Sequence, residues 1–290
     1  MNPAALESPS SYQREFPFSN ADFDALRELV REMTGISLNE AKRELVYGRV
    51  ARRLRALGLD SFAEYRAMLA SDEDGELGEF CNAMTTNLTA FFRESHHFNY
   101  LRDELLLPRL ARARETGARR MRFWCAGCSS GEEPYSLAMI ICEAIPDWRR
   151  WDIRILATDI DTGILEHARR GLYPADRVRS LAPERLQAFF IQRPGERAPA
   201  YQVNDDLAGM VTFKQLNLMH KLPMSGPLDA IFCRNVIIYF DKDTQRGLFA
   251  RIAPLQRPGD MLFLGHSESL FKVTDAYRLI GRTIFRRAEA

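Results

Sequence analysis

A short glycine-containing segment followed by two acidic residues is the first place in this sequence that could bind a ligand. Residues 121–126 read as a strand, and Gly127-Cys-Ser-Ser-Gly131 and then Glu132 and Glu133 follow directly. The glycine spacing matches neither the dinucleotide fingerprint G-x-G-x-x-G nor a phosphate-binding P-loop. Two glutamates at the start of a helix also repel an anion. The segment suits a ligand that is cationic or rich in hydroxyl groups, although a plain strand–helix turn would explain it equally well.

An acidic residue stands at the end of the next predicted strand, residues 153–158. An acid at the tip of the second strand of an open α/β sheet commonly binds the two hydroxyls of a ribose. Asp159 lies 28 residues after Gly131, farther than the roughly 20 residues of the dinucleotide fingerprint. We expect Asp161 to cap the helix that follows, which leaves Asp159 for a ligand.

Polar residues also follow the third and fourth predicted strands, residues 211–216 and 228–233. Asn217 comes after the third strand, and Arg234 and Asn235 come after the fourth. The carboxyl ends of parallel strands share one edge of the sheet, so all three side chains belong to the same crevice. They either bind a ligand there or, in the case of Arg234 and Asn235, close the loop through hydrogen bonds.

The segment from Thr85 to Ser95 is polar at first and then aromatic, which is unusual just before such a sheet. An ordinary interdomain linker is the alternative interpretation, and we expect Phe91 and Phe92 to pack in the core in either case.

The sequence gives little support for a metal site or for a catalytic nucleophile. Cys125 and Cys128 form a lone C-x-x-C pair, whereas a structural zinc site needs four ligands. His96 and His97 lack the H-E-x-x-H context, so we expect them on a helix surface. Gly127-Cys-Ser-Ser-Gly131 matches the letters of the nucleophile motif G-x-S-x-G, but we do not expect a catalytic serine there. We therefore expect no metal.

A basic stripe lies on a predicted helix over residues 39–57. Its residues are Lys42, Arg49, Arg52 and Arg53, and they fall within about 100° of the helix circumference. A solvated charged face is one interpretation. Because the stripe is nearly unpaired along the sequence and the first 85 residues carry a net charge of −5, a docking surface for an acidic partner is the other. Nucleic acid and acidic protein helices both fit that description.

The elements that must position these residues fall into two groups. Helical patterns cover residues 20–34, 39–57, 61–70 and about 79–86, with a loop over 72–78. From residue 120, apolar runs alternate with helical patterns at 136–145, 163–170 and 243–253, and two more strand runs precede the end of the chain, at 261–264 and in a hairpin over 277–286. This alternation predicts an α/β fold with a mostly parallel sheet covered on both faces. Residues 172–210 interrupt it and are expected to form a small inserted subdomain.

The composition indicates a globular protein and argues against a membrane-spanning or disulfide-rich one. The chain has 290 residues, 46% of them apolar and 27% charged, which are the values of a globular protein. No run approaches the roughly 18–20 apolar residues of a membrane span, and no signal peptide is visible. Five cysteines are too few and too odd a number for a disulfide scaffold. We expect a cytoplasmic protein with a frayed, disordered tail over 1–17, a helical domain over 18–86 and an α/β domain over 87–290.

The sequence resembles the CheR family, the chemotaxis-receptor glutamate O-methyltransferases that use S-adenosylmethionine. The resemblance covers roughly residues 20–288, in order and with similar spacing. It rests on six stretches: KRELVYGRVARRLRALGLDSF (42–62), TTNLTAFFRESHHF (85–98), GCSSGEEPYSLA (127–138), ATDIDTGILEHARRGLYP (157–174), FCRNVIIYFDKDTQ (232–245) and GDMLFLGHSESL (259–270).

The resemblance implies a class I, Rossmann-like methyltransferase domain with a mixed sheet and an inserted antiparallel β-subdomain, preceded by an all-helical domain. It implies S-adenosylmethionine as cofactor, S-adenosylhomocysteine as product, no metal, and glutamate methyl esters on chemoreceptors as the outcome of the reaction. It implies that Arg93 and Tyr239 lie nearest the transferred methyl group. The cofactor contacts that it implies come from Asn87, Thr89, Arg93, Glu133, Asp159, Asn217, Leu218, Arg234 and Asn235.

The resemblance also implies partners. The basic helix, through Lys42, Arg49, Arg52 and Arg53, would dock on the acidic helical bundle of a receptor, and in some relatives the β-subdomain binds a peptide at the receptor's C-terminus. We expect a monomer that neither binds nucleic acid nor inserts into a membrane. Two alternatives remain: a nucleic-acid methyltransferase, although Asn235 is followed by Val-Ile-Ile rather than Pro-Pro-aromatic, and a non-catalytic module that only senses the cofactor or docks on receptors.

Overall fold

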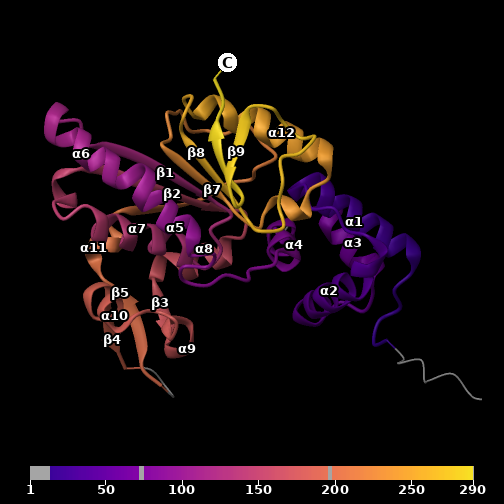
Figure 1. Cartoon of the computed structure of the whole chain (residues 1–290). Helices are drawn as coiled ribbons and strands as arrows, with labels where there is room; N and C mark the ends of the chain where they lie inside the picture. The colour runs from indigo at the N-terminus through magenta and orange to yellow at the C-terminus, as the bar shows by residue number, and fades with distance from the viewer. Residues whose placement is uncertain (1–13, 72–74, 195–197, 290) are drawn as a thin grey trace, which may run out of the picture.

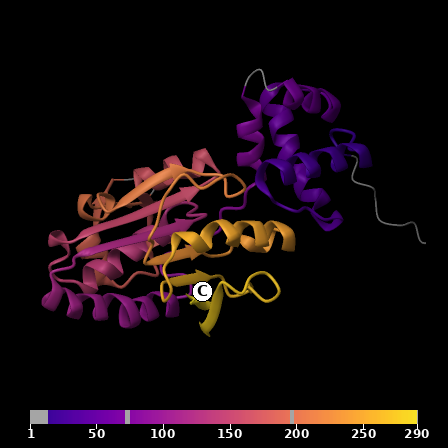
Figure 2. The same ribbon diagram turned by 90° about the horizontal axis from the view of Figure 1, so that it is seen from above.

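The computed structural model describes residues 14–71, 75–194 and 198–289. The structure has a helical domain, a central domain built on a seven-stranded sheet, and a small three-stranded sheet that is inserted along the chain between two strands of the large sheet (Figure 1). The helical domain stands beside one end of the large sheet, and the small sheet projects from another side (Figures 1 and 2). None of the helices in the described parts combines the length and apolar character needed to cross a membrane.

The helical domain buries one apolar face from each of its helices. Ser19 begins the first helix with a capping box shared with Asp22, and Gly35 ends it in a left-handed conformation, so the helix covers the predicted residues 20–34. Side chains such as Phe23, Val50 and Phe80 then meet in one core. The elements are α1 (Asn20–Thr34), a 3-10 turn (Glu40–Lys42), α2 (Arg43–Leu57), α3 (Phe62–Ser71) and α4 (Glu76–Met84).

Two boundaries of this domain differ from those expected. Residues 1–13 of the expected tail lie outside the described residues, but Phe16 is buried and Arg14 lies over the ring of Tyr47, so the packed domain begins before residue 18. The expected loop over 72–78 ends earlier, because α4 already starts at Glu76. That start brings Glu76 into an ion pair with Arg53, a long-range contact that cannot be predicted from the local sequence.

The large sheet has the strand order β6-β2-β1-β7-β8-β10-β9. Its first five strands are parallel, and the terminal hairpin adds two antiparallel strands, so the mixed sheet is confirmed. The strands are β1 (Arg120–Ala126), β2 (Asp152–Asp159), β6 (Val211–Gln215), β7 (Ala230–Cys233), β8 (Met261–Leu264), β9 (Tyr277–Gly281) and β10 (Ile284–Arg287).

Helices cover both faces of this sheet, and the pleat of β1 shows how. Phe123 and Cys125 point into one core together with α7 and α8, whereas Trp124 points into the other core with α12. The covering helices are α5 (His96–Leu101), α6 (Leu107–Thr116), α7 (Glu132–Ala144), α8 (Thr162–Arg170) and α12 (Lys242–Ile252), with 3-10 turns at Trp148–Arg150, Ile237–Tyr239 and Ala253–Leu255.

The helical segment from His96 to Thr116 is the main element that the sequence analysis left unassigned. A π-helical turn over Arg102–Leu106 joins α5 to α6 and blurs the 3.6-residue period on which a sequence assignment depends. The expectation that both histidines lie on a helix surface is wrong for His97, which is fully buried beside Phe263.

Residues 172–208 form a compact subdomain, as expected for an insertion. Three antiparallel strands in the order β3-β5-β4 make its sheet, and Tyr173 and Phe190 pack on Phe91 where the subdomain meets the main domain. Its elements are β3 (Leu172–Pro174), α9 (Ala175–Val178), α10 (Pro183–Phe189), β4 (Phe190–Arg193), β5 (Ala200–Val203) and α11 (Asp205–Ala208).

Candidate functional site

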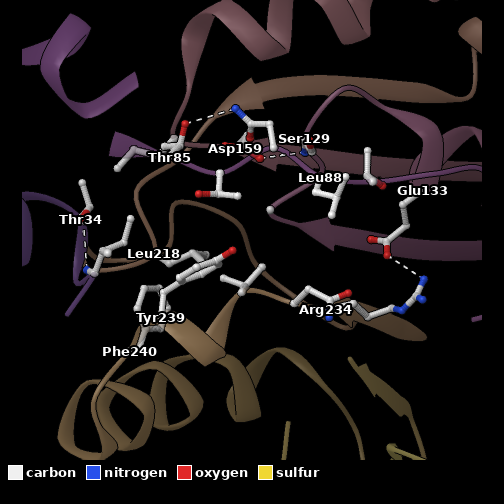
Figure 3. Close-up of a pocket in the computed structure, with 18 of the residues that line it drawn as sticks. Thr34, Thr85, Leu88, Ser129, Glu133, Asp159, Leu218, Arg234, Tyr239 and Phe240 are labelled. Carbon is white, nitrogen blue, oxygen red and sulfur yellow. Dashed lines mark hydrogen bonds and ion pairs between the residues drawn. The ribbon is translucent and has the colours of Figure 1, made fainter. Parts of the chain in front are cut away.

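A pocket opens where the carboxyl ends of β1, β2, β6 and β7 meet the helical domain (Figure 3). It encloses about 1010 Å³ of empty space, counted out to its mouth. Each of the four strands contributes residues directly after its end, and the connection from α4 to α5 lines the pocket from Met84 to Arg93. Thr34 and Ile36 add a wall from the helical domain. The site is therefore built between the two domains.

The pocket brings together all the residues that the sequence and the resemblance proposed for the cofactor and for catalysis. They are Asn87, Thr89, Arg93, Glu133, Asp159, Asn217, Leu218, Arg234, Asn235 and Tyr239. Most of them meet there because parallel strands bring their following loops to one edge, whereas Asn87, Thr89 and Arg93 reach the pocket on the connection from α4 to α5. Their individual contacts differ, and those contacts decide which side chains are available to a ligand.

The turn after β1 approaches the opposite wall closely. Gly127 has a φ of +74°, and a Cβ on it would lie 2.4 Å from Cγ2 of Val236, so only glycine fits. The N–H groups of Gly127 and Cys128 donate to the carbonyl of Thr158, which locks the turn onto β2. Ser129 follows with a φ of +49°, and its buried hydroxyl has no hydrogen-bond partner among the described residues. This hydroxyl borders the pocket as a free polar group.

Asp159 is a buried carboxylate at the end of β2. It accepts hydrogen bonds from the N–H groups of Ser129 (2.8 Å) and Asp161 (3.1 Å). Burial raises the pKa of this carboxyl, and the two backbone hydrogen bonds oppose that shift. Asp161 caps α8 by accepting from the N–H of Ile164, as predicted. Its other oxygen accepts hydrogen bonds from the side chains of Thr85 and Asn87, and so holds residues 85–95, here called the junction segment. Of the two aspartates, Asp159 is the one that lines the pocket.

The two glutamates at the start of α7 have separate tasks. Glu132 is fully buried against Arg177 and Ser130, away from the pocket. Glu133 lines the pocket, and its carboxylate lies 3.0 Å from Nη1 of Arg234 (Figure 3). Burial raises the pKa of Glu133, while the charge of Arg234 works in the opposite direction.

Arg234 is held by two carboxylates. Besides Glu133 it pairs with Glu94 at 3.2 Å and donates to the carbonyl of Arg93. Burial alone would raise the pKa of Glu94, but hydrogen bonds from His266 and the charge of Arg234 outweigh it and lower that pKa to about 2. The guanidinium of Arg234 is thus neutralised within the protein and serves to tie the pocket walls together.

Arg93 differs from Arg234 in this respect. Its guanidinium donates to the carbonyl of Leu88 at 2.9 Å, and no carboxylate among the described residues forms an ion pair with it. Tyr239 comes from the opposite wall, and its ring points into the cavity (Figure 3). The N–H of Ser37 in the helical domain donates to its carbonyl, which fixes the backbone there.

Two asparagines line the pocket with their amides already engaged. Asn217 donates to the carbonyl of Met33 at 2.6 Å and accepts from the N–H of Met219. Asn87 donates to Asp161. Both side chains bind one part of the protein to another, so their side-chain amides are less available to a ligand than the sequence suggested.

Several residues of the site were missed by sequence reasoning. Thr34 and Ile36 carry no local signal, because they reach the pocket only through the packing of the two domains. Glu94 and Glu268 lie inside stretches that match the family, but their ion pairs and hydrogen bonds are long-range.

The basic stripe on α2 does not behave as one surface. Arg53 pairs with buried Glu76 at 2.6 Å and lies 3.8 Å from Glu79. Arg49 donates to the carbonyl of Met84 and to Thr86. The expectation of a nearly unpaired stripe is therefore wrong for Arg53, whereas Arg49 is held by hydrogen bonds and forms no ion pair among the described residues. Lys42 and Arg52 are exposed, and within the described residues neither forms an ion pair.

The two cysteines of the C-x-x-C pair are buried, and burial raises the pKa of both thiols. In the parts of the chain that the structure describes, no three His, Cys, Asp or Glu side chains are grouped so that they could hold a metal ion.

Comparison with known proteins identifies the family of this chain. A model described as "CheR methyltransferase, SAM binding domain" matches residues 87–286, and one described as "CheR methyltransferase, all-alpha domain" matches residues 21–85. The chain is 44% identical to Chemotaxis protein methyltransferase 2 of Pseudomonas aeruginosa, over 99% of this chain and all of that protein. It is 43% identical to the Chemotaxis protein methyltransferase of Salmonella typhimurium, over 92% of this chain and 90% of that protein, and 42% identical to that of Escherichia coli, over 92% and 91%. The chain belongs to the CheR methyltransferase family.

Proposed function

We propose that this protein transfers the methyl group of S-adenosylmethionine to glutamate side chains of chemoreceptors and so forms glutamate methyl esters. The names of its relatives, chemotaxis protein methyltransferases, support the reaction class. The observation that carries the choice of acceptor is Arg93: of the two arginines lining the pocket, it is the one without a carboxylate partner in the described chain. An unpaired guanidinium in a pocket favours an acceptor that is itself a carboxylate.

The donor set fits S-adenosylmethionine, which supplies a methyl group activated on a positively charged sulfonium. Asp159 presents a buried carboxylate to the hydroxyls of a ribose. Glu133 places negative charge where a sulfonium would be stabilised, and the free hydroxyl of Ser129 borders the same space. Apolar side chains for the adenine ring come from Ile160, Leu216, Leu218 and Phe240.

The protein needs no general base for this reaction. A glutamate carboxyl has a pKa of about 4.3, so the acceptor is already ionised at neutral pH. The work of the site is then orientation, because holding two reacting groups in line lowers the barrier by several kcal/mol. In our proposal Arg93 holds the acceptor carboxylate, Tyr239 packs beside the sulfonium, and Asp159 and Glu133 fix the cofactor.

For receptor docking we propose the exposed part of the basic stripe, Lys42 and Arg52, as the surface that meets acidic helices of the receptor. Arg49 and Arg53 belong to the same proposal, but their present contacts give them a structural task as well. A peptide at the receptor's C-terminus and a monomeric state, both implied by the family resemblance, also remain proposals. Residues 195–197 of the β-subdomain lie outside the described residues.

A methyl-transfer assay tests the proposal. The protein is incubated with S-adenosylmethionine carrying a labelled methyl group and with the cytoplasmic fragment of a chemoreceptor, and the product is then treated with alkali. Label that is released as methanol identifies a carboxyl ester and supports the proposal. Label that resists alkali means N-methylation, and no transfer despite measurable cofactor binding means a sensor or adaptor; either result contradicts it. A receptor fragment with its acceptor glutamates replaced by alanine is the control.

A further inference from the structure

The turn after β8, residues 265–268, touches both walls of the pocket without lining it. Glu268 is buried, and each of its oxygens accepts two backbone hydrogen bonds. Oε2 accepts from the N–H groups of Gly265 (2.5 Å) and Asn235 (2.9 Å), and Oε1 accepts from those of Val236 (2.8 Å) and Ile238 (3.2 Å). Three of the four donors belong to the loop after β7, which carries Asn235, Tyr239 and Phe240 into the pocket.

The loop after β7 needs such an acceptor. Asn235 has a φ of +59°, a left-handed conformation that aims successive N–H groups toward one point. Glu268 itself is buried, and an N–H group left unpaired beside it would be costly. Gln245 holds the carbonyl side of the same loop by donating to Ile237 and Phe240. On the N–H side, Glu268 accepts from Asn235, Val236 and Ile238, whereas the N–H groups of Tyr239 and Phe240 donate to carbonyls within the loop.

Close packing brings the turn within reach of this loop. A Cβ on Gly265 would lie 2.5 Å from Nδ2 of Asn235 and 2.8 Å from its backbone nitrogen. On the other side of the turn, His266 donates through its backbone N–H to Glu94 at 3.1 Å, and its ring Nδ1 lies 2.9 Å from the same carboxylate oxygen. Glu94 in turn pairs with Arg234. The turn thus joins the junction segment that bears Arg93 to the loop that bears Tyr239.

We propose that Glu268 is a positioning residue for methyl transfer: its carboxylate fixes the loop after β7 so that Asn235 and Tyr239 stand opposite Arg93. The catalytic part of this inference rests on the proposed function, whereas the effect on cofactor binding and on the loop does not. Glutamine in place of glutamate is a sharp test, because whichever way its amide is turned, one oxygen becomes an NH₂ group. Two of the four N–H groups then face a donor instead of an acceptor.

The test compares Glu268→Gln with Asp260→Asn. Asp260 is also a buried carboxylate that accepts from a backbone N–H, that of Arg257 at 2.7 Å, but it lies at the opposite end of β8. The measurements are the Kd for S-adenosylhomocysteine by calorimetry, kcat and KM with a receptor fragment, and backbone hydrogen exchange, all below the unfolding temperature of each variant. Glu268→Asp is measured alongside as a milder change.

For Glu268→Gln we expect faster exchange at residues 235–238 and 265, a Kd raised at least about tenfold, and a kcat lowered about 100-fold, as for a misplacement near 1 Å. KM for the receptor should change little, since the docking surface is elsewhere. Glu268→Asp should fall between wild type and Glu268→Gln, and Asp260→Asn should keep the wild-type Kd and kcat. Binding and turnover of Glu268→Gln within twofold of wild type, or equal losses in Asp260→Asn, would overturn the proposal. If no variant and no wild type methylates the receptor but Glu268→Gln still loses affinity and protection, the positioning role stands and the proposed acceptor is wrong.

Discussion

The pocket and the basic stripe on α2 are both groups of functional residues predicted from the sequence. They differ in whether the structure brings all the predicted residues together. Every residue proposed for the pocket lines it. Of the four residues proposed for the stripe, Arg53 is held by Glu76 and Arg49 by the junction segment, while Lys42 and Arg52 remain exposed. Residues that follow parallel strands are gathered by topology, whereas the partners of a charge on a helix surface depend on which other helix packs against it.

The largest expected effect concerns Arg93 in the pocket. Arg93→Ala should lower kcat by at least about 100-fold, because it removes the unpaired guanidinium that holds the acceptor. The Kd for S-adenosylhomocysteine should change much less. Arg93→Lys keeps the charge but loses the two-pronged geometry and should give an intermediate kcat. Steady-state kinetics with a receptor fragment measure this, and near-normal turnover of Arg93→Ala would remove Arg93 from the reaction.

Cofactor binding gives the next largest effect. Asp159→Asn should raise the Kd for S-adenosylhomocysteine by about 10- to 100-fold, since hydrogen bonds to a charged group contribute about 1.5–3 kcal/mol. Calorimetry measures it. The control is Asp152→Asn at the other end of β2, where the carboxylate is exposed and pairs with Arg122. Equal affinities of both variants would mean that Asp159 does not hold the cofactor.

On α2 the comparison predicts that the neighbouring residues Arg52 and Arg53 differ in how much they contribute to the free energy of unfolding. Arg53→Ala should lower the free energy of unfolding by about 2 kcal/mol, because among the described residues it leaves the hydroxyl of Tyr65 as the remaining hydrogen-bond donor to the buried carboxylate of Glu76. Arg52→Ala should change that free energy by less than about 0.5 kcal/mol, as for other exposed positions. Urea denaturation distinguishes them, and similar stability losses would show that the pairing with Glu76 contributes nothing.

The smallest effect concerns docking. Replacing both Lys42 and Arg52 by alanine should raise KM for the receptor about three- to tenfold at low salt, with kcat and the Kd for S-adenosylhomocysteine unchanged, because exposed charges act mainly on encounter. Added salt should shrink the difference between the variant and wild type. A KM equal to that of wild type at low salt would place receptor docking on another surface.

The same contrast explains what the sequence could predict. The strand positions and the cap at Asp161 follow from local patterns, so the sheet and the residues at its edge could be predicted. The π-helical turn before α6, the burial of His97 and the pairing of Arg53 with Glu76 depend on contacts between distant segments. Glu268 belongs with these, since three of its four hydrogen bonds exist only once β7 and β8 lie side by side.

A crystal structure with bound S-adenosylhomocysteine tests the central claim most directly, namely that the pocket between the domains holds the cofactor and faces its methyl-bearing sulfur toward Arg93. The account predicts both ribose hydroxyls within hydrogen-bond distance of Asp159 and the sulfur between Glu133 and the opening bordered by Arg93 and Tyr239. Cofactor bound outside this pocket, or bound inside it with the sulfur turned away from Arg93, would contradict the account.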